Sequence, residues 1–228
     1  MVQFLRLKQC FMISDNLKQV KSRIDSVQSS QNVKLIAVSK TRSTAEIQEA
    51  VDAGQVHFGE NYLQESIEKI NFFKGSGLIW HFIGPIQSNK TSSIADNFDW
   101  VHSVDRIKVA RRLSDQRNPA LGALNILIQV NVDREESKSG VEIQNVEEIV
   151  MEIESLPNIC LRGFMTIPRP ENSKNSFAEM KHLISKYPNF DSLSMGMSSD
   201  LEVAIEHGAN LVRAVSYTHL TLPTILLV

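Results

Sequence analysis

The chain has 228 residues, of which 42% are hydrophobic, and its formal net charge is −2, with acidic and basic residues mixed along the whole length. This composition predicts a globular protein with one sizeable core, and it excludes a polybasic surface for nucleic acid or anionic membranes and any apolar stretch long enough to span a bilayer. Cys10 and Cys160 lie far apart without a Cys/His cluster, which argues against a disulfide framework and indicates the cytoplasm. We expect a monomer.

The chain begins with a segment that we do not assign to the fold. Residues 1–12 lack the cleavage site of a signal peptide, so we interpret them as a non-native or disordered extension, with Met12 as a candidate start. After Ser14, Leu17 and Ile24 belong to a series of apolar residues at intervals of three and four. This spacing predicts a helix with one buried face before the first strand.

The first predicted strand is Val33 to Lys40, whose centre is continuously apolar and whose last residue is a lysine. Such a run is typical of a parallel strand that is covered on both faces. Ser43 and Glu46 then form the pattern of a capping box, and the helix that they start is expected to end at Gly54.

The same strand-helix unit repeats along the chain. Further strands are expected at residues 56–59, 78–84, 100–104, 124–132, 159–165 and 192–195 and from Leu211, and further helices at residues 62–73, 89–97, 106–117, 144–155, 173–186 and 200–207. Eight strands that alternate with helices through short loops predict an α/β fold, a closed (β/α)8 barrel over residues 13–213. An open doubly wound sheet is the alternative, but no strand precedes a glycine-rich dinucleotide fingerprint.

Barrel enzymes keep their chemistry on the rim formed by the carboxyl ends of the strands. The side chains that we expect there are Lys40, Glu60, Asn61, His81, His102, Asn131, Met165, Thr166, Ser198, Ser199 and Arg213. Lys40 attracts most interest, because a partly desolvated lysine is more often the free amine that attacks an aldehyde to form a Schiff base. The plainer interpretation is a lysine that extends from a strand end into water.

Two other rim features suggest a phosphorylated aldehyde. Gly196, Ser198 and Ser199 precede a predicted helix, an arrangement that can hold phosphate on backbone amides and hydroxyls, although serines before a helix are usually only caps. Pyridoxal 5'-phosphate (PLP) would fit, and so would the sugar phosphate of a Schiff-base aldolase. Arg213 opposite a pyridine nitrogen would keep that nitrogen unprotonated, and the alternative role for Arg213 is a salt bridge at a strand end.

Several motifs resemble those of the pyridoxal phosphate homeostasis proteins, in order and at the spacing of that family, from about Ile13 to Arg213. The matching segments are Ala37 to Thr41, Phe58 to Tyr62, Trp80 to Lys90, Ser137 to Gly140, Arg162 to Met165 and Ser194 to Ser198.

This resemblance implies the barrel of alanine racemase without its second domain, with Lys40 holding PLP as an internal aldimine. It also implies that Asn61 and His81 line the pocket, that Ser198 and Ser199 lie near the phosphate, and that Arg213 faces the ring nitrogen; we add Met165 from the rim. Members of the family resemble carriers rather than enzymes, so we expect a protein that buffers PLP and passes it to PLP-dependent apoenzymes, without catalysis of its own.

The chain departs from the family pattern after Arg213, where the family continues with a glycine and a threonine that wrap the phosphate. Here Ala214 and Val215 are followed by Ser216, which could supply one hydroxyl to the phosphate. We interpret residues 214–228 as a foreign tail, and we predict weaker retention of PLP than in an intact relative.

Other functions remain open from the residues alone. A racemase would need a second base opposite Lys40, which alanine racemases take from a second domain of the partner chain. A class I aldolase would share the lysine and the phosphate site, but it usually carries that lysine on a later strand. His57, His81 and His102 come from consecutive strands and could hold the metal of a barrel hydrolase, but lone histidines more often belong to the packing. Lys138 could act as a second amine, although a solvated surface charge is the simpler interpretation.

Overall fold

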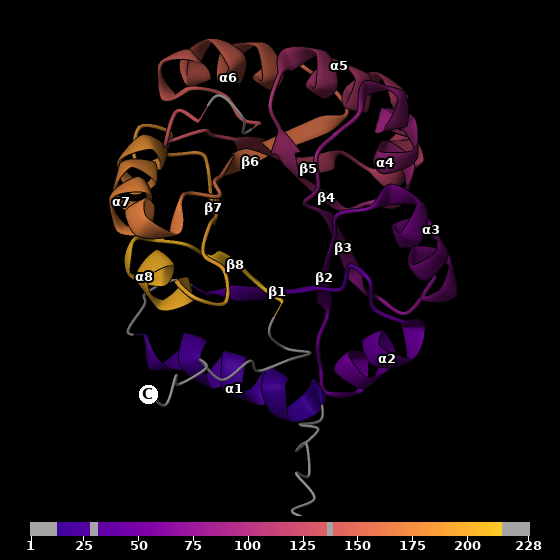
Figure 1. The fold of residues 1–228 in the computed structure, drawn as a ribbon. Helices are drawn as coiled ribbons and strands as arrows, with labels where there is room; N and C mark the ends of the chain where they lie inside the picture. Colours follow the sequence, from indigo (N-terminus) through magenta and orange to yellow (C-terminus); the bar gives the residue numbers. More distant parts are fainter. Residues whose placement is uncertain (1–12, 28–31, 136–138, 216–228) are drawn as a thin grey trace, which may run out of the picture.

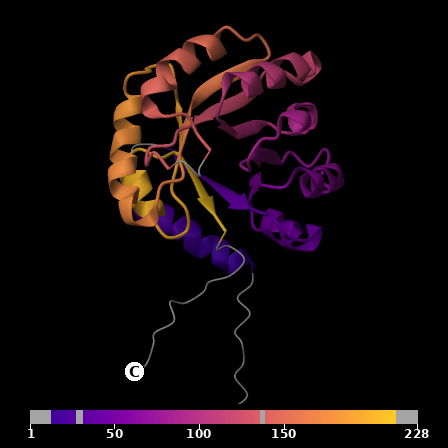
Figure 2. The same cartoon turned by 45° about the horizontal axis from the view of Figure 1, so that its top comes forward.

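The computed structural model describes residues 13–27, 32–135 and 139–215. Within these residues eight parallel strands form a closed ring in chain order, each strand pairing with the next and β8 pairing with β1, while helices surround the ring (Figure 1). The predicted (β/α)8 barrel is therefore confirmed. Figure 2 shows the ring from an inclined direction, with the helices on its outside.

The elements follow the predicted order. The strands are β1 (Lys34–Val38), β2 (His57–Glu60), β3 (Ile79–Phe82), β4 (Trp100–Val104), β5 (Leu124–Gln129), β6 (Ile159–Met165), β7 (Ser192–Ser194) and β8 (Leu211–Ala214). The helices are α1 (Ile13–Ser26), α2 (Thr44–Asp52), α3 (Leu63–Phe72), α4 (Thr91–Asn97), α5 (Ile107–Gln116), α6 (Val146–Glu154), α7 (Ser173–Ile184) and α8 (Leu201–Glu206). Short 3-10 turns lie at Ser88–Lys90, Pro119–Leu121, Ile143–Asn145 and Pro170–Asn172.

Two separate cores hold the barrel together. The larger core lies between the strands and the surrounding helices, and every helix packs apolar residues against it, although those of α3 are only half-buried. The smaller core lies inside the ring and consists of Ile36, Trp100, Leu127, Met165 and Leu211. Side chains alternate across a strand, so every second residue of each strand faces this interior. The interior also receives several polar side chains, which are described below.

The ring closes where β1 meets β8, with Ile36 opposite Arg213 and Ala37 opposite Ala214. β8 thus includes Ala214, the first residue of the segment that we expected to be foreign. Closure places the end of β1, which leads to Lys40, directly beside the end of β8. Ser216, Lys138, Met12 and the remainder of residues 1–12 and 216–228 lie outside the described residues.

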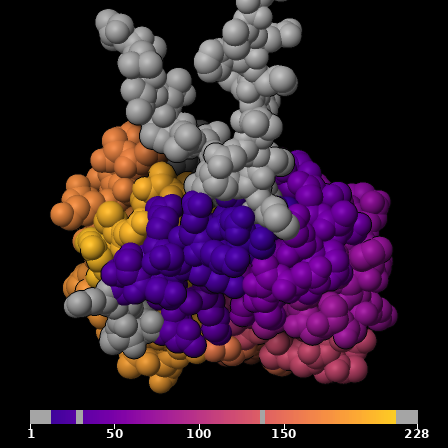
Figure 3. Space-filling view, turned by 90° about the horizontal axis from the view of Figure 1, so that it is seen from below, coloured from indigo at the N-terminus to yellow at the C-terminus, as the bar shows by residue number. Residues whose placement is uncertain are grey.

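α1 closes the outside of the barrel over the β1 and β8 seam. It packs between α2 and α8, as the space-filling view in Figure 3 shows. The Arg23 side chain donates two hydrogen bonds to the Glu202 carboxylate of α8, at 2.6 and 2.8 Å. No helix in the described part of the chain is both long enough and apolar enough to cross a membrane.

Candidate functional site

Lys40 follows β1 at the carboxyl rim. The β1 and β2 ladder extends one residue beyond β1, because the Ser39 amide donates to the Gly59 carbonyl at 2.9 Å. Lys40 itself is half-buried, and within the residues that the structure describes its ammonium group has no hydrogen bond or ion pair. The next residue, Thr41, has a φ of 61°, a left-handed conformation that is uncommon for a residue with a side chain. Lys40 therefore follows the carboxyl end of β1, as expected, and its amine has no partner among the described residues.

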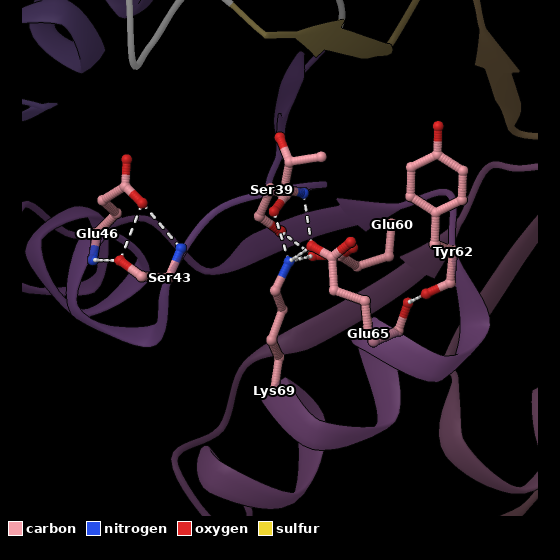
Figure 4. Close-up of polar contacts among 9 residues, drawn as sticks. Ser39, Ser43, Glu46, Glu60, Tyr62, Glu65 and Lys69 are labelled. Carbon is pink, nitrogen blue, oxygen red and sulfur yellow. Dashed lines mark hydrogen bonds and ion pairs between the residues drawn. The ribbon is translucent and has the colours of Figure 1, made fainter.

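The backbone around Lys40 rests on a cluster of charged side chains from β2 and α3, shown in Figure 4. Lys69 is only 4% exposed, and its ammonium donates to the Ser39 carbonyl at 2.6 Å, to Oε1 of Glu60 at 2.8 Å and to the Glu65 carboxylate. Glu60 also accepts a hydrogen bond from the Ser39 hydroxyl at 2.6 Å, and Glu65 accepts one from the Thr41 amide. We call Lys69, Glu60 and Glu65 the clamp.

The end of β2 also leaves two polar atoms without partners. Oε2 of Glu60 and Oδ1 of Asn61 are buried, and neither has a hydrogen-bond partner among the described residues. Burial raises the pKa of the Glu60 carboxyl, and the hydrogen bonds from Lys69 and Ser39 oppose this shift. Gly84 packs directly against this point: a Cβ atom there would lie 2.2 Å from the Asn61 carbonyl oxygen. Unpaired buried oxygens are rare, and they often mark the place of a ligand or an ordered water.

Arg213 lies inside the barrel near the same rim and is almost completely buried. Its Nη1 atom donates to the carbonyl and the hydroxyl of Ser194, at 3.0 and 2.5 Å, and its Nη2 atom donates to the Thr166 carbonyl at 2.9 Å. Burial lowers the pKa of Arg213 to about 10, so the guanidinium is still charged at neutral pH. The alternative of a salt-bridged strand end does not hold for the described residues, because all three acceptors are neutral.

Three histidines continue from Arg213 through the interior of the barrel. Ser194 Oγ lies 2.9 Å from Nδ1 of His102, Nε2 of His102 lies 2.9 Å from Nδ1 of His81, and Nε2 of His81 lies 3.0 Å from Nδ1 of His57. We call His57, His81 and His102 the histidine chain. His81 and His102 lie one and two residues before the ends of their strands, below the rim on which we had placed them. Within the described residues no group of three or more His, Cys, Asp or Glu side chains is arranged to hold a metal ion.

The hydrogen bonds of the histidine chain all run in one direction. Burial lowers the pKa of His81 and His102, with further lowering by the neighbouring charges, so each ring is neutral and carries one N–H and one acceptor nitrogen. A ring that donates on one side therefore accepts on the other, and the tautomer of one ring fixes the tautomer of the next. The chain ends on the Ser194 hydroxyl, which also accepts from Arg213.

The loop after β7 is built tightly against α8. Gly196 has a φ of 88°, and a Cβ atom there would lie 2.5 Å from Cβ of Ala204, so only glycine fits. The Met197 amide donates to Oδ1 of Asp200 at 2.7 Å, and the Val215 amide donates to the Ser198 hydroxyl at 3.2 Å. This last bond joins the loop after β7 to the residue that follows β8.

The structure thus brings together part of the predicted set. Lys40, Asn61 and Arg213 come from the neighbouring strands β1, β2 and β8, and Ser198 is bonded to the end of β8. Ser199 is exposed on the same loop, whereas Met165 is fully buried in the interior core. Both nitrogens of His81 are taken by other histidines. Asn131 lies on the loop after β5, where its side chain donates to the Glu135 carbonyl at 2.8 Å.

Sequence reasoning assigned no role to Ser194 or Lys69. Ser194 lies in the segment Ser194 to Ser198 that resembles the family, but nothing in the short Ser-Leu-Ser strand β7 marks its hydroxyl as a partner of Arg213. Lys69 follows Glu65 by four residues in a helix, a spacing that indicates an ion pair but not its burial.

The chain matches the family described as alanine racemase, N-terminal domain, over residues 12–214. It is 43% identical over 217 residues to the pyridoxal phosphate homeostasis protein of Escherichia coli K12, and the match covers 88% of this chain and 93% of that protein. Among solved structures it is similar to PipY of Synechococcus elongatus PCC7942, known without PLP and with PLP bound, at 32% identity with TM-scores of 0.81 and 0.79. Each match covers 90% of this chain and 99% of PipY.

The fold alone is also shared with larger proteins. The alanine racemase of Clostridium difficile 630 superposes with a TM-score of 0.73 at 13% identity, over 94% of this chain and 58% of that one.

Proposed function

The chain belongs to the family of pyridoxal phosphate homeostasis proteins, and from this membership we propose that it binds PLP covalently at Lys40 and acts as a carrier. The observation on which the proposal depends is the pairing of β1 with β8. This pairing makes the strand that leads to Lys40, whose amine lacks a partner among the described residues, the neighbour of the strand that carries Arg213, a buried guanidinium that contacts only neutral acceptors there.

The residues of the rim fit the cofactor. A covalently bound aldehyde needs an accessible amine, and Lys40 is half-buried without a competing ion pair in the described chain. A pyridine nitrogen needs a partner, and the described residues take three of the five N–H groups of Arg213. The buried oxygens of Glu60 and Asn61 are further polar atoms that lack partners in this part of the chain.

PLP supplies an aldehyde that condenses with a primary amine and a pyridine ring that withdraws electrons strongly only when its nitrogen is protonated. We propose that Nζ of Lys40 forms the Schiff base and that Arg213 donates to the ring nitrogen. Because Arg213 is charged at neutral pH and has no acceptor atom, it keeps that nitrogen unprotonated. The ring is then a weak electron sink, which suits storage better than catalysis.

The remaining residues are assigned to position the cofactor. We propose that Asn61, His81 and Met165 would line the pocket of the cofactor and that Ser198 and Ser199 would hold its phosphate with Ser216. Gly196 supports the phosphate assignment because its lack of a side chain lets the loop pack against α8. The Asp200 carboxylate already takes the Met197 amide, so that amide is not available to an anion.

We propose a carrier without turnover that passes PLP to apoenzymes, and the support for this role is that the relatives are named for pyridoxal phosphate homeostasis. Racemisation would require a second base on the face of the substrate opposite Lys40. Exchange of the α-proton of amino acids in deuterated water tests the racemase alternative, and measurable exchange that depends on Lys40 would contradict the carrier assignment.

The covalent assignment is tested by a spectrum of the purified protein with and without added PLP. We expect a near-visible absorbance band that borohydride removes, leaving a stable mass increase on the peptide that contains Lys40. Lys40→Ala should show neither the band nor the labelled peptide. A band of unchanged intensity in Lys40→Ala would overturn the proposal.

A further inference from the structure

The clamp touches the chain on both sides of Lys40 but not the Lys40 side chain. Lys69 has three N–H groups, and each has its own acceptor: the Ser39 carbonyl, Glu60 and Glu65. Ser39 is held at two atoms, since its hydroxyl donates to Glu60 as well. Figure 4 shows these contacts converging on the Lys69 ammonium from β1, β2 and α3.

The second point of contact is Thr41. Its amide donates to the same Glu65 oxygen that Lys69 contacts, and its left-handed φ of 61° is a conformation that a threonine adopts only when its surroundings hold it there. The residue before Lys40 and the residue after it are therefore attached to one cluster. A helical turn of α3 carries both Glu65 and Lys69, so α3 determines where this backbone lies.

The clamp makes the buried face of α3 polar, which is unusual for a helix that packs against a barrel. The buried residues of α3 are Ser66 and Lys69, while its apolar residues Leu63, Ile67 and Ile70 are only half-buried. A buried ammonium loses its hydration and needs good acceptors in return. Buried ion pairs of this kind contribute little net stability. A role in holding the adjacent backbone in place therefore explains the clamp better than a contribution to stability.

We infer that Lys69, together with Glu60 and Glu65, is a positioning cluster that fixes the backbone on both sides of Lys40 and so presents its amine to the PLP aldehyde. This inference rests on the proposed function and deepens it. In the step concerned, Nζ of unprotonated Lys40 forms a C=N bond with the aldehyde carbon, and the aldehyde oxygen leaves as water. The clamp takes no part in the bond changes; it limits the positions that Nζ can occupy.

The test compares covalent with non-covalent binding in the full chain. Pyridoxine 5'-phosphate has the same ring and phosphate but an alcohol in place of the aldehyde, so calorimetry with it measures the pocket without the covalent step. We expect Lys69→Met to form the PLP adduct about 10 to 100 times more slowly than wild type, while its affinity for pyridoxine 5'-phosphate stays within about twofold.

Glu65→Ala provides a second variant should Lys69→Met fail to fold, because Glu65 is partly exposed and its removal releases Thr41 directly. We expect the same selective loss of the covalent step, and faster hydrogen exchange at the Thr41 amide in the protein without cofactor. Glu68→Gln is the matched control, since Glu68 is an exposed carboxylate on the same helix. It should behave as wild type in all three measurements.

Each result has a defined meaning. If wild type forms no adduct on Lys40, the proposed function fails. If wild type forms the adduct and Lys69→Met or Glu65→Ala forms it at the wild-type rate, the positioning role alone is wrong. Equal losses of adduct formation and of pyridoxine 5'-phosphate affinity would also overturn it, because they indicate general damage to the pocket.

Discussion

The clamp and the histidine chain are both buried polar clusters that support a basic residue of the candidate site, but they are built in opposite ways. The clamp consists of charged groups close to the rim, and its bonds end on the backbone beside Lys40. The histidine chain consists of neutral rings inside the barrel, and its bonds end on the side chain of Ser194, which holds Arg213. One cluster places a backbone, and the other orients a side chain.

The difference follows from the depth of burial. Charged groups can be accommodated near the rim because Glu65, which pairs with Lys69, is still partly exposed. Water therefore solvates part of this ion pair and reduces the cost of burying it. The middle of the barrel is fully enclosed, and Arg213 already brings one charge there, so additional ionised groups would be costly. Imidazole is well suited to this place, since a neutral ring both donates and accepts and can transmit one hydrogen-bond direction from strand to strand.

The largest effect should come from breaking the clamp. Lys69→Met leaves the fully buried Glu60 carboxylate without its counter-charge, and we expect the free energy of unfolding to fall by about 3–5 kcal/mol. Urea denaturation followed by circular dichroism measures this loss. The double variant Glu60→Gln/Lys69→Met should recover part of it, because no isolated charge remains; a double variant that is less stable than Lys69→Met would contradict the charge-pair explanation.

Breaking the histidine chain should cost less. His102→Leu leaves Nδ1 of His81 without a partner and leaves the Ser194 hydroxyl with Arg213 alone, and we expect a loss of about 1–3 kcal/mol by the same denaturation experiment. His182→Leu, at an exposed position on α7, serves as the control and should change stability by less than about 0.5 kcal/mol. A loss for His102→Leu as large as that for Lys69→Met would remove the distinction between charged and neutral clusters.

The smallest effect concerns pH. Burial and then Lys34 lower the pKa of His57 below its usual 6.5, so on acidification the unfolded chain takes up the proton first and stability should fall as the pH drops below about 6.5. Replacing His57 with Asn should make this decline shallower by at most about 1.4 kcal/mol per pH unit. Glu60 should act in the opposite sense, because its raised pKa favours the folded state as the pH falls toward 4.5. Urea midpoints measured between pH 7.5 and 4.5 test both signs, and an unchanged slope in His57→Asn would show that His57 does not contribute.

The fold was accessible from the sequence because local signals agreed with one another. The apolar run before Lys40 predicts a buried strand, and the capping box of Ser43 and Glu46 predicts the start of a helix. The structure contains both the strand and the capping box. The end of β5 was harder: it stops at Gln129 rather than at residue 132, since Val130 continues the apolar run but forms only an isolated bridge with Val141. Hydrophobicity alone does not distinguish a strand end from a buried loop.

The site was only partly accessible, for reasons that differ between the two clusters. Lys40 and Arg213 could be placed because strand ends meet on one rim. The position of Lys69 could not be predicted, because the apolar residues Leu63, Ile67 and Ile70 indicate that their own face of α3 is buried, and Lys69 does not lie on that face. The sequence showed that the three histidines come from consecutive strands. It did not show that their rings form a chain of contacts rather than a group around one point. That arrangement depends on the stagger between neighbouring strands, which is a property of the whole barrel and not of any single segment.

The closure of the ring by β1 and β8 has a consequence for synthesis. Lys40 belongs to the first strand to leave the ribosome and Arg213 to the last, so the chain cannot offer both to one small molecule until translation has reached β8. PLP bound to both residues would then stabilise the pairing of β1 with β8. It would oppose the separation of these strands, which exposes two strand edges with unpaired backbone groups.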